Sequence, residues 1–163
     1  MGFKPAKQPE EKDKMIILYA DGAHRGSSDA SAYSFYLQYK ALEKIDGQAV
    51  WGKTNNAMEI TAVLEGLKAI KTPKVPVKVY SDSEYVIRCL TLKWYEGWER
   101  NGWKNSKKEP VKNADLWREL IKEVRRFSFI SYQWVRGHDI DLNNIKVDEF
   151  ANQLMDELEM EVK

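Results

Sequence analysis

The sequence predicts an α/β fold in which helices cover a mixed sheet. Segments with the two-residue alternation of strands come first, and segments with the three- and four-residue spacing of helices then alternate with further strands. A helical segment precedes the short strand at 77–81, and a crossover of this kind makes that strand parallel to a neighbour. Such an order of segments is typical of helices packed on a mixed sheet.

The first third of the chain predicts three strands. The apolar segment 15–20 predicts a strand that ends just before Asp21, and the glycines that follow predict a turn. Residues 32–42 alternate apolar and polar side chains, which predicts a strand with one solvated face. A hairpin turn at 43–48 then leads to a short returning strand at 49–53.

The middle of the chain changes to helical spacing. Residues 54–71 carry apolar side chains three and four positions apart, with N-cap candidates at their start. The strand at 77–81 follows, and residues 83–92 predict a second helix. This middle region therefore provides the crossover that the parallel strand requires.

The last third begins with a polar, aromatic and basic stretch. A helix then starts at Asn113 or Asp115, and residues 127–135 alternate as a strand does. The final helix has an unbroken apolar stripe from Val147 to Leu158.

Length and composition favour one globular domain. We expect a disordered tail at 1–14 and a single folded domain at 15–163. No apolar run approaches the ~20 residues of a membrane span, so no membrane partner is expected. The single cysteine, Cys89, excludes an internal disulfide and suits the cytoplasm. Nothing in the sequence demands more than a monomer.

The net charge of +1 hides a basic segment at 100–126 and an acidic one at 139–163.

Two of the predicted strands run directly into an aspartate. If the strands that precede Asp21 and Asp82 are parallel neighbours, the two carboxylates lie side by side at the carboxyl edge of the sheet. Like charges at this distance repel, and a hard divalent cation such as Mg²⁺ or Mn²⁺ relieves that repulsion. The alternative is that each aspartate stabilises a turn or caps a helix, and the residues alone leave both interpretations open.

Two further acids lie beside apolar helix stripes. Glu59 is early in the helix at 54–71, and Asp148 is expected in the first turn of the last helix. Acids are also favoured near helix N-termini without any catalytic role, so neither position alone indicates an active site.

Five blocks of sequence together resemble one family. They are YADG, TNNAMEI, VYSDS, KEPVKNADLW and WVRGHDIDLNNIKVDEFAN. In order and spacing they are similar to ribonuclease H of the bacterial type 1 class, from about Met15 to Leu158. This resemblance implies a five-stranded mixed sheet of order 3-2-1-4-5 with helices on both faces. It also implies an endoribonuclease that hydrolyses the RNA strand of RNA–DNA hybrids and leaves 5′-phosphate and 3′-hydroxyl ends.

The resemblance assigns roles to individual residues. Matching positions imply four metal-binding carboxylates and an auxiliary histidine, namely Asp21, Glu59, Asp82, Asp148 and His138. Two Mg²⁺ ions, or Mn²⁺ in their place, are the implied cofactors.

Other matching positions imply contacts with the hybrid. Asn55 and Asn56 match residues that read the RNA 2′-hydroxyl, and Ser27 stands where the family often has asparagine. Thr54 and Asn113 match a pocket for a DNA phosphate. The basic protrusion is implied to contain Trp94, Trp98, Trp103, Lys104, Lys107, Lys108 and Lys112. We expect at least Trp98 and Trp117 to be part of the core.

Two other functions remain compatible with these patterns. One is a ribonuclease H-like nuclease that acts on DNA, against which the protrusion and the paired asparagines argue. The other is a catalytically silent module that binds hybrids, for which a lost carboxylate would be expected. A domain cut from a reverse transcriptase is a third possibility.

Overall fold

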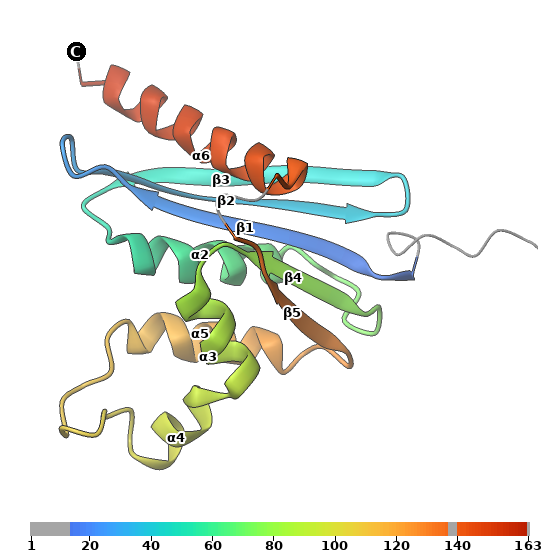
Figure 1. Cartoon of the computed structure of the whole chain (residues 1–163), viewed down its shortest axis with the longest axis vertical. Coiled ribbons are helices and arrows are strands. Elements are labelled where there is room, and N and C mark those ends of the chain that lie inside the picture. The colour runs from blue at the N-terminus through green and yellow to red at the C-terminus, as the bar shows by residue number, and fades with distance from the viewer. Residues whose placement is uncertain (1–13, 137–139, 163) are drawn as a thin grey trace, which may run out of the picture.

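The computed structural model describes residues 14–136 and 140–162, and its core is one mixed five-stranded sheet (Figure 1). The strands are β1 (Ile16–His24), β2 (Ala30–Tyr39), β3 (Leu42–Trp51), β4 (Val77–Ser81) and β5 (Ile130–Trp134). Their order across the sheet is β3-β2-β1-β4-β5, which confirms the predicted topology. The tail expected at 1–14 lies outside the described residues, apart from Lys14.

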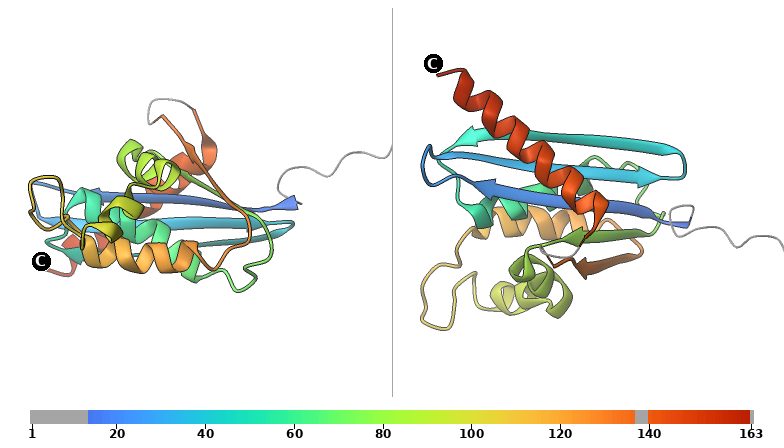
Figure 2. Two further views of the ribbon diagram at one scale, coloured as in Figure 1. Left: turned by 90° about the horizontal axis from the view of Figure 1, so that it is seen from below. Right: turned by 45° about the horizontal axis from the view of Figure 1, so that its top comes forward.

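Helices cover both faces of this sheet. They are α2 (Asn55–Lys68), α3 (Glu84–Leu92), α4 (Trp94–Arg100), α5 (Ala114–Val124) and α6 (Leu142–Met160). Helix α6 crosses β1, β2 and β3 on one face, whereas α2 packs on the other face with α5 against it (Figure 2). None of the helices in the described ranges is both long and apolar enough to span a membrane.

The central strand β1 is buried on both of its faces. Leu18 and Ala20 belong to the main core with α2 and α5, while Ile17 and Tyr19 pack on the side of Val147 in α6. A strand covered by helices on both sides can be apolar at consecutive positions, and this explains the unbroken apolar run of the sequence.

The hairpin between β2 and β3 differs from the prediction. The turn lies at 40–41, where Lys40 has a positive φ of 54°, and Asp46 and Gly47 are inside β3. A Cβ at Gly47 would lie within 3.0 Å of the Tyr33 carbonyl oxygen and close to Leu154 of α6. Glycine is therefore present here because backbone and helix approach closely, and the Asp-Gly pair does not form a turn.

Strand β1 is also longer than expected. Its parallel pairing with β4 ends at Ala20 opposite Ser81, but its antiparallel pairing with β2 continues to His24. The prediction that the strand ends before Asp21 was therefore wrong, because a second neighbour supplies hydrogen bonds after the first one stops.

Candidate active site

Three carboxylates from three separate elements meet at the carboxyl ends of β1 and β4. Asp21 belongs to β1, Glu59 to α2, and Asp82 directly follows β4. One carboxylate oxygen from each lies within 4.8 Å of the other two. Asp148 of α6 lies near this group, since its charge acts on both Asp21 and Asp82. Three of the four predicted acids thus lie within ligand distance of one another, and the fourth lies near them.

Strand register places the two aspartates. Ala20 pairs with Ser81 across the parallel strands, so the residues that follow, Asp21 and Asp82, leave the ladder side by side. The alternative role of Asp82 as a helix cap does not apply, because the Ser83 hydroxyl accepts the hydrogen bond from the Val86 amide.

Gly22 brings Glu59 to the two aspartates. A Cβ at Gly22 would lie less than 3.0 Å from the backbone of Met58 and Glu59, so only glycine allows α2 to approach β1 this closely. The Gly22 amide interacts with both the Asp21 and Glu59 carboxylates. The turn predicted at this glycine was wrong, and close packing of a helix on a strand is the reason for it.

Asp148 reaches the group from further along α6 than predicted. Asp141 accepts hydrogen bonds from the Asn143 and Asn144 amides, so the helix begins at Leu142 and Asp148 lies in its second turn. Tyr19 of β1 donates a hydrogen bond of 2.8 Å to Asp141 Oδ2. The N-cap of α6 is thereby tied to the same strand that carries Asp21.

Burial and mutual repulsion make the acids hard to ionise. Asp21 is 3% exposed and Glu59 is 5% exposed. Burial, and then the charges of Asp82 and Asp148, raise the pKa of Asp21 to about 8. Burial, followed by the charges of Asp21 and Asp82, raises the pKa of Glu59 well above its usual range. The pKa of Asp82 is also raised, first by burial and then by Asp148.

The donor set fits divalent cations. Asp21 Oδ2 and Glu59 Oε2 are buried and have no hydrogen-bond partner within the described part of the chain. Unpaired buried carboxylate oxygens are costly, and hard cations such as Mg²⁺ are bound by oxygen ligands of this kind. Asp82 is half-buried and Asp148 is exposed, so the group is open to solvent on their side.

The predicted DNA-phosphate residues lie together. One pocket is lined by Thr54, Asn55, Asn56, Lys112 and Asn113. Thr54 also caps α2, because its Oγ1 accepts a hydrogen bond from the Ala57 amide. Asn113 precedes α5 in a left-handed conformation and makes no cap hydrogen bond with its side chain. The pocket therefore joins the positions predicted to contact both strands of a hybrid.

Ser27 is exposed in the tight turn between β1 and β2. This turn is tied to the segment before α2, because the Gly52 amide donates to the Asp29 carbonyl and the Lys53 amide donates to Ser31 Oγ. Ser27 and the paired asparagines accordingly belong to one edge of the molecule.

The protrusion is held to the domain by tryptophans whose rings pack against one another at an angle. Trp98 lies 5.7 Å from the ring centre of fully buried Trp117 and 6.0 Å from that of Trp103. The guanidinium of Arg118 lies over the Trp103 ring, a contact that the sequence did not reveal. Trp94 is 37% exposed, and the exposed lysines are Lys104, Lys107, Lys108 and Lys112. Packing thus accounts for Trp98 and Trp103, while Trp94 and the lysines face solvent.

His138 lies outside the described residues, which stop at Arg136 and resume at Ile140. Sequence reasoning also missed the contact that supports Asp82 from β5. Trp134 Nε1 donates a hydrogen bond of 3.2 Å to the Asp82 carbonyl. In the sequence, the one indication of this contact is a tryptophan at the end of an alternating strand, and packing in the core explains such a tryptophan equally well.

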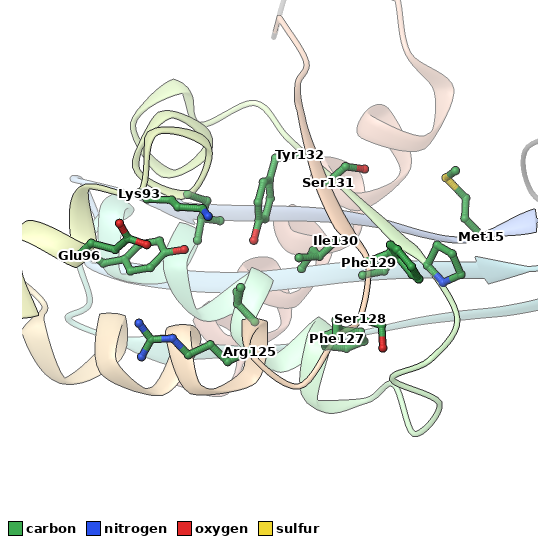
Figure 3. Close-up of a pocket in the computed structure, with 15 residues that line it drawn as sticks. Met15, Lys93, Glu96, Arg125, Phe127, Ser128, Phe129, Ile130, Ser131 and Tyr132 are labelled. Atoms are coloured by element: carbon green, nitrogen blue, oxygen red, sulfur yellow. The ribbon is translucent and has the colours of Figure 1, made fainter.

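A different pocket, of about 780 Å³, lies along β5 (Figure 3). Tyr132, Arg125 and Phe129 are among its lining residues, and none of the four carboxylates lines it. It is therefore separate from the acidic group.

The comparisons with known proteins identify the family. A sequence model of the RNase H family matches residues 13–156, which is most of the chain. The chain belongs to the ribonuclease H family. Ribonuclease H of Saccharopolyspora erythraea is 40% identical over 150 residues, which cover 92% of this chain and 96% of that protein. Ribonuclease HI of Pseudomonas aeruginosa is 39% identical over 149 residues, which cover 89% and 96% of the two chains.

Solved ribonuclease H structures share the fold. The N-terminal ribonuclease H domain of a Mycobacterium tuberculosis protein superposes with a TM-score of 0.72 at 22% identity, covering 93% of this chain and 100% of that one. A foamy viral protease-reverse transcriptase in complex with an RNA/DNA hybrid gives a TM-score of 0.76 at 20% identity, covering 95% of this chain and 22% of that one. As a ribonuclease H, the chain is a metal-dependent endoribonuclease that acts on RNA–DNA hybrids.

Proposed function

We propose that Asp21, Glu59, Asp82 and Asp148 hold two Mg²⁺ ions and that the enzyme thereby cuts the RNA strand into 5′-phosphate and 3′-hydroxyl ends. The observation that carries this proposal is the convergence of Asp21, Glu59 and Asp82, with Asp148 near them and with buried oxygens that lack partners among the described residues. When bound there, two divalent cations stabilise the attacking and leaving oxygens of an in-line displacement. Mn²⁺ is an alternative occupant with the same preference for oxygen ligands.

The acids differ in what they contribute. Asp21 and Glu59 are buried where α2 packs closely on β1 at Gly22, so they provide the rigid part of the site. Asp82 and Asp148 lie on the solvent side, where the scissile phosphate can approach. We assign His138 an auxiliary part in proton transfer or product release, because it matches the family's histidine in the sequence.

The residues proposed to recognise the substrate lie at the edge of the molecule next to these acids. Asn55, Asn56 and Ser27 are proposed to contact the RNA strand, where the 2′-hydroxyl distinguishes RNA from DNA. Thr54 and Asn113 are proposed to bind a phosphate of the DNA strand, and Lys112 beside them adds positive charge. The protrusion, with Trp94, Trp98, Trp103 and its exposed lysines, is proposed to lie along the hybrid. The catalytic domain is proposed to span 15–163 and to act as a cytoplasmic monomer.

Strand-labelled substrates test this function directly. The enzyme is incubated with an RNA–DNA hybrid, with duplex RNA and with duplex DNA, each in Mg²⁺ and in EDTA. We expect Mg²⁺-dependent cutting of the RNA strand of the hybrid alone. Cutting of duplex DNA would support the DNA-directed nuclease instead, and binding without cutting would support a silent hybrid-binding module.

A further inference from the structure

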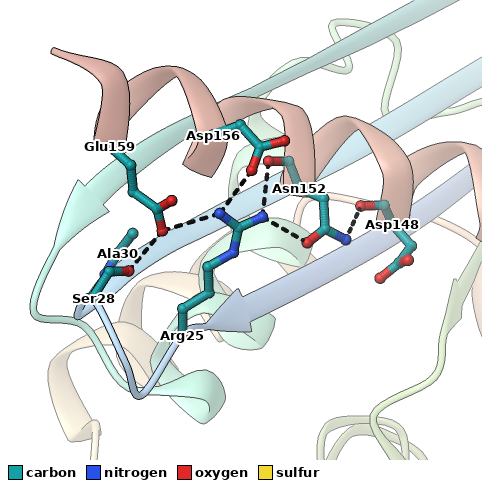
Figure 4. Close-up of polar contacts among 7 residues, drawn as sticks. All are labelled: Arg25, Ser28, Ala30, Asp148, Asn152, Asp156 and Glu159. Atoms are coloured by element: carbon teal, nitrogen blue, oxygen red, sulfur yellow. Dashed lines mark hydrogen bonds and ion pairs between the residues drawn. The ribbon is translucent and has the colours of Figure 1, made fainter.

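Arg25 joins the turn after β1 to the last helix. Its Nη1 lies 2.8 Å from Asp156 Oδ1 and 3.0 Å from Glu159 Oε1. Its Nη2 donates to the side-chain oxygen of Asn152 at 3.1 Å and to the Asn152 carbonyl at 3.3 Å. Figure 4 shows the guanidinium of Arg25 turned toward these three residues of α6. One arginine therefore contacts three successive turns of a helix from a different element.

The turn itself is closed by its own hydrogen bonds. The Arg25 amide donates to the Ala30 carbonyl, and the Asp29 amide donates to the Arg25 carbonyl, both at 2.8 Å. The Ser28 hydroxyl donates to Glu159 Oε1 at 2.7 Å, so a second residue of the turn shares the acid that binds Arg25. Ser27 lies between these two anchored residues and is exposed.

The contacts have the geometry of a specific interaction. The Arg25 side chain is 25% exposed and that of Glu159 is 31% exposed, so solvent screens the pair only in part. The fork of the guanidinium engages two acids and an amide at once, which a lysine ammonium cannot reproduce. An isolated ion pair on the surface contributes little to the free energy of folding. A network in which one guanidinium binds several groups can nevertheless fix the position of a loop.

We propose that Arg25 is a positioning residue for recognition of the RNA strand. It holds the turn at 25–29 against α6, so that Ser27 meets a ribose 2′-hydroxyl in a fixed orientation. This inference rests on the proposed function, which places Ser27 at the RNA strand. Beyond that function, Arg25 is the residue that fixes the contact made by Ser27. Helix α6 is the support against which the turn is held.

The residues that hold the turn at 25–29 are different from the four catalytic acids. The network meets the catalytic acids through Asn152, whose amide donates to the Asp148 backbone carbonyl at 3.0 Å. The position of α6 near Asp148 is also secured independently, because Ser34 Oγ donates to the Val147 carbonyl at 2.6 Å. Loss of Arg25 should therefore affect substrate binding more than turnover.

The test compares Arg25→Ala and Arg25→Lys with the unsubstituted enzyme on an all-ribose hybrid. It then uses a series of hybrids with one 2′-deoxynucleotide moved along the RNA strand. We expect Arg25→Ala to raise KM about fivefold, the ratio that corresponds to one hydrogen bond, and to leave kcat within about twofold. Ser27→Ala identifies the deoxy position that Ser27 reads, because that variant loses the penalty there. We expect deoxy substitution at this position to raise KM for the unsubstituted enzyme and not for Arg25→Ala.

Further variants keep the outcome decisive. Adding Ser27→Ala to Arg25→Ala should raise KM no further, and Arg25→Lys should recover only part of the loss. Arg88→Ala serves as the matched control, because it removes an exposed arginine that pairs with Glu84 within α3. A KM unchanged in Arg25→Ala, or persistence in it of the deoxy penalty that Ser27→Ala removes, would overturn the inference. Equal losses in kcat and thermal stability without a change in KM would also overturn it. Absence of hybrid cutting by the unsubstituted enzyme would contradict the proposed function itself.

Discussion

Asp21 is subject to several constraints at once. It is buried in the central strand, and one of its oxygens has no hydrogen-bond partner among the described residues. The negative charges of Asp82 and Asp148 also raise its pKa. A carboxylate in this position is unfavourable for folding unless a cation is present. Function and stability are therefore opposed at this residue.

Asp21→Asn should abolish cleavage and stabilise the metal-free protein. We expect kcat to fall at least about a hundredfold, since several kcal/mol of transition-state stabilisation are lost. In EDTA, removing one of the repelling charges should raise the unfolding midpoint by roughly 5 °C. Hybrid cleavage and thermal unfolding measure the two effects. Asp46→Asn, the same change on the exposed edge strand, should leave both unaltered. A variant with near-full turnover would refute the role of Asp21.

Gly22→Ala should disrupt the site without touching a carboxylate. The added methyl group would collide with the backbone of Met58 and Glu59, which cannot rotate away as a side chain can. We expect a loss of at least about 2 kcal/mol in the free energy of unfolding, with reduced cleavage, because overpacking moves α2 away from β1. Urea denaturation gives the stability change. Gly26→Ala is the control, because no atom lies within 4 Å of the added Cβ. Equal stability of the two variants would contradict this explanation of Gly22.

At the scale of elements, α6 is attached to the sheet by a few defined contacts. Small residues such as Ala30, Ala32 and Ala151 let the helix lie close to β2. At its N-terminus, Tyr19 donates to Asp141, and the Tyr19 ring stacks on Tyr80 of β4 with centroids 4.5 Å apart. The start of the helix is thus linked to both strands that deliver Asp21 and Asp82.

Tyr19→Phe removes this link and keeps the stacked ring. We expect a loss of about 1 kcal/mol in the free energy of unfolding, the usual net value of one hydrogen bond. The midpoint of thermal unfolding should fall by roughly 3 °C. Scanning calorimetry measures the change, and Tyr39→Phe, at the far end of β2, is the control. An unchanged midpoint would show that the hydroxyl does not contribute to holding α6.

At the scale of the whole molecule, the raised pKa values make stability depend on pH and metal. Asp21 keeps its proton in the folded state up to a pKa of about 8, whereas its ordinary value is 3.8. Between these values the folded state binds more protons than the unfolded state, so stability falls as the pH rises. The contribution of Asp21 is fully present below about pH 4 and is lost as the pH passes through about 8.

This predicts a specific comparison in EDTA. The stability advantage of Asp21→Asn over the unsubstituted protein should grow from pH 5 to pH 8.5, as the aspartate is forced to ionise. Saturating Mg²⁺ should reduce that advantage, because only the aspartate gains from the cation. Urea denaturation of both proteins at each pH, with and without Mg²⁺, gives four curves of the free energy of unfolding against pH. An advantage that is constant with pH would show that Asp21 is not protonated in the folded state.

Much of the fold could be predicted from periodicity. The fold class, the α2 cap at Thr54 and the parallel pairing of the strand at 77–81 are confirmed by the structure. The hairpin at 43–48 and the turn at Gly22 were wrong, since both glycines are explained by contacts with distant residues. A glycine required for close packing has the same local sequence signal as a glycine required for a turn.

The sequence by itself determined which acids exist and which segments carry them, because helical and strand spacing depends on residues close together in the chain. Only the tertiary structure decided that oxygens of Asp21, Glu59 and Asp82 lie within 4.8 Å of one another. It also decided that Arg25 reaches Asn152, Asp156 and Glu159. Those distances depend on strand register and on how closely helices pack on the sheet, and both are set by contacts between residues far apart in the chain.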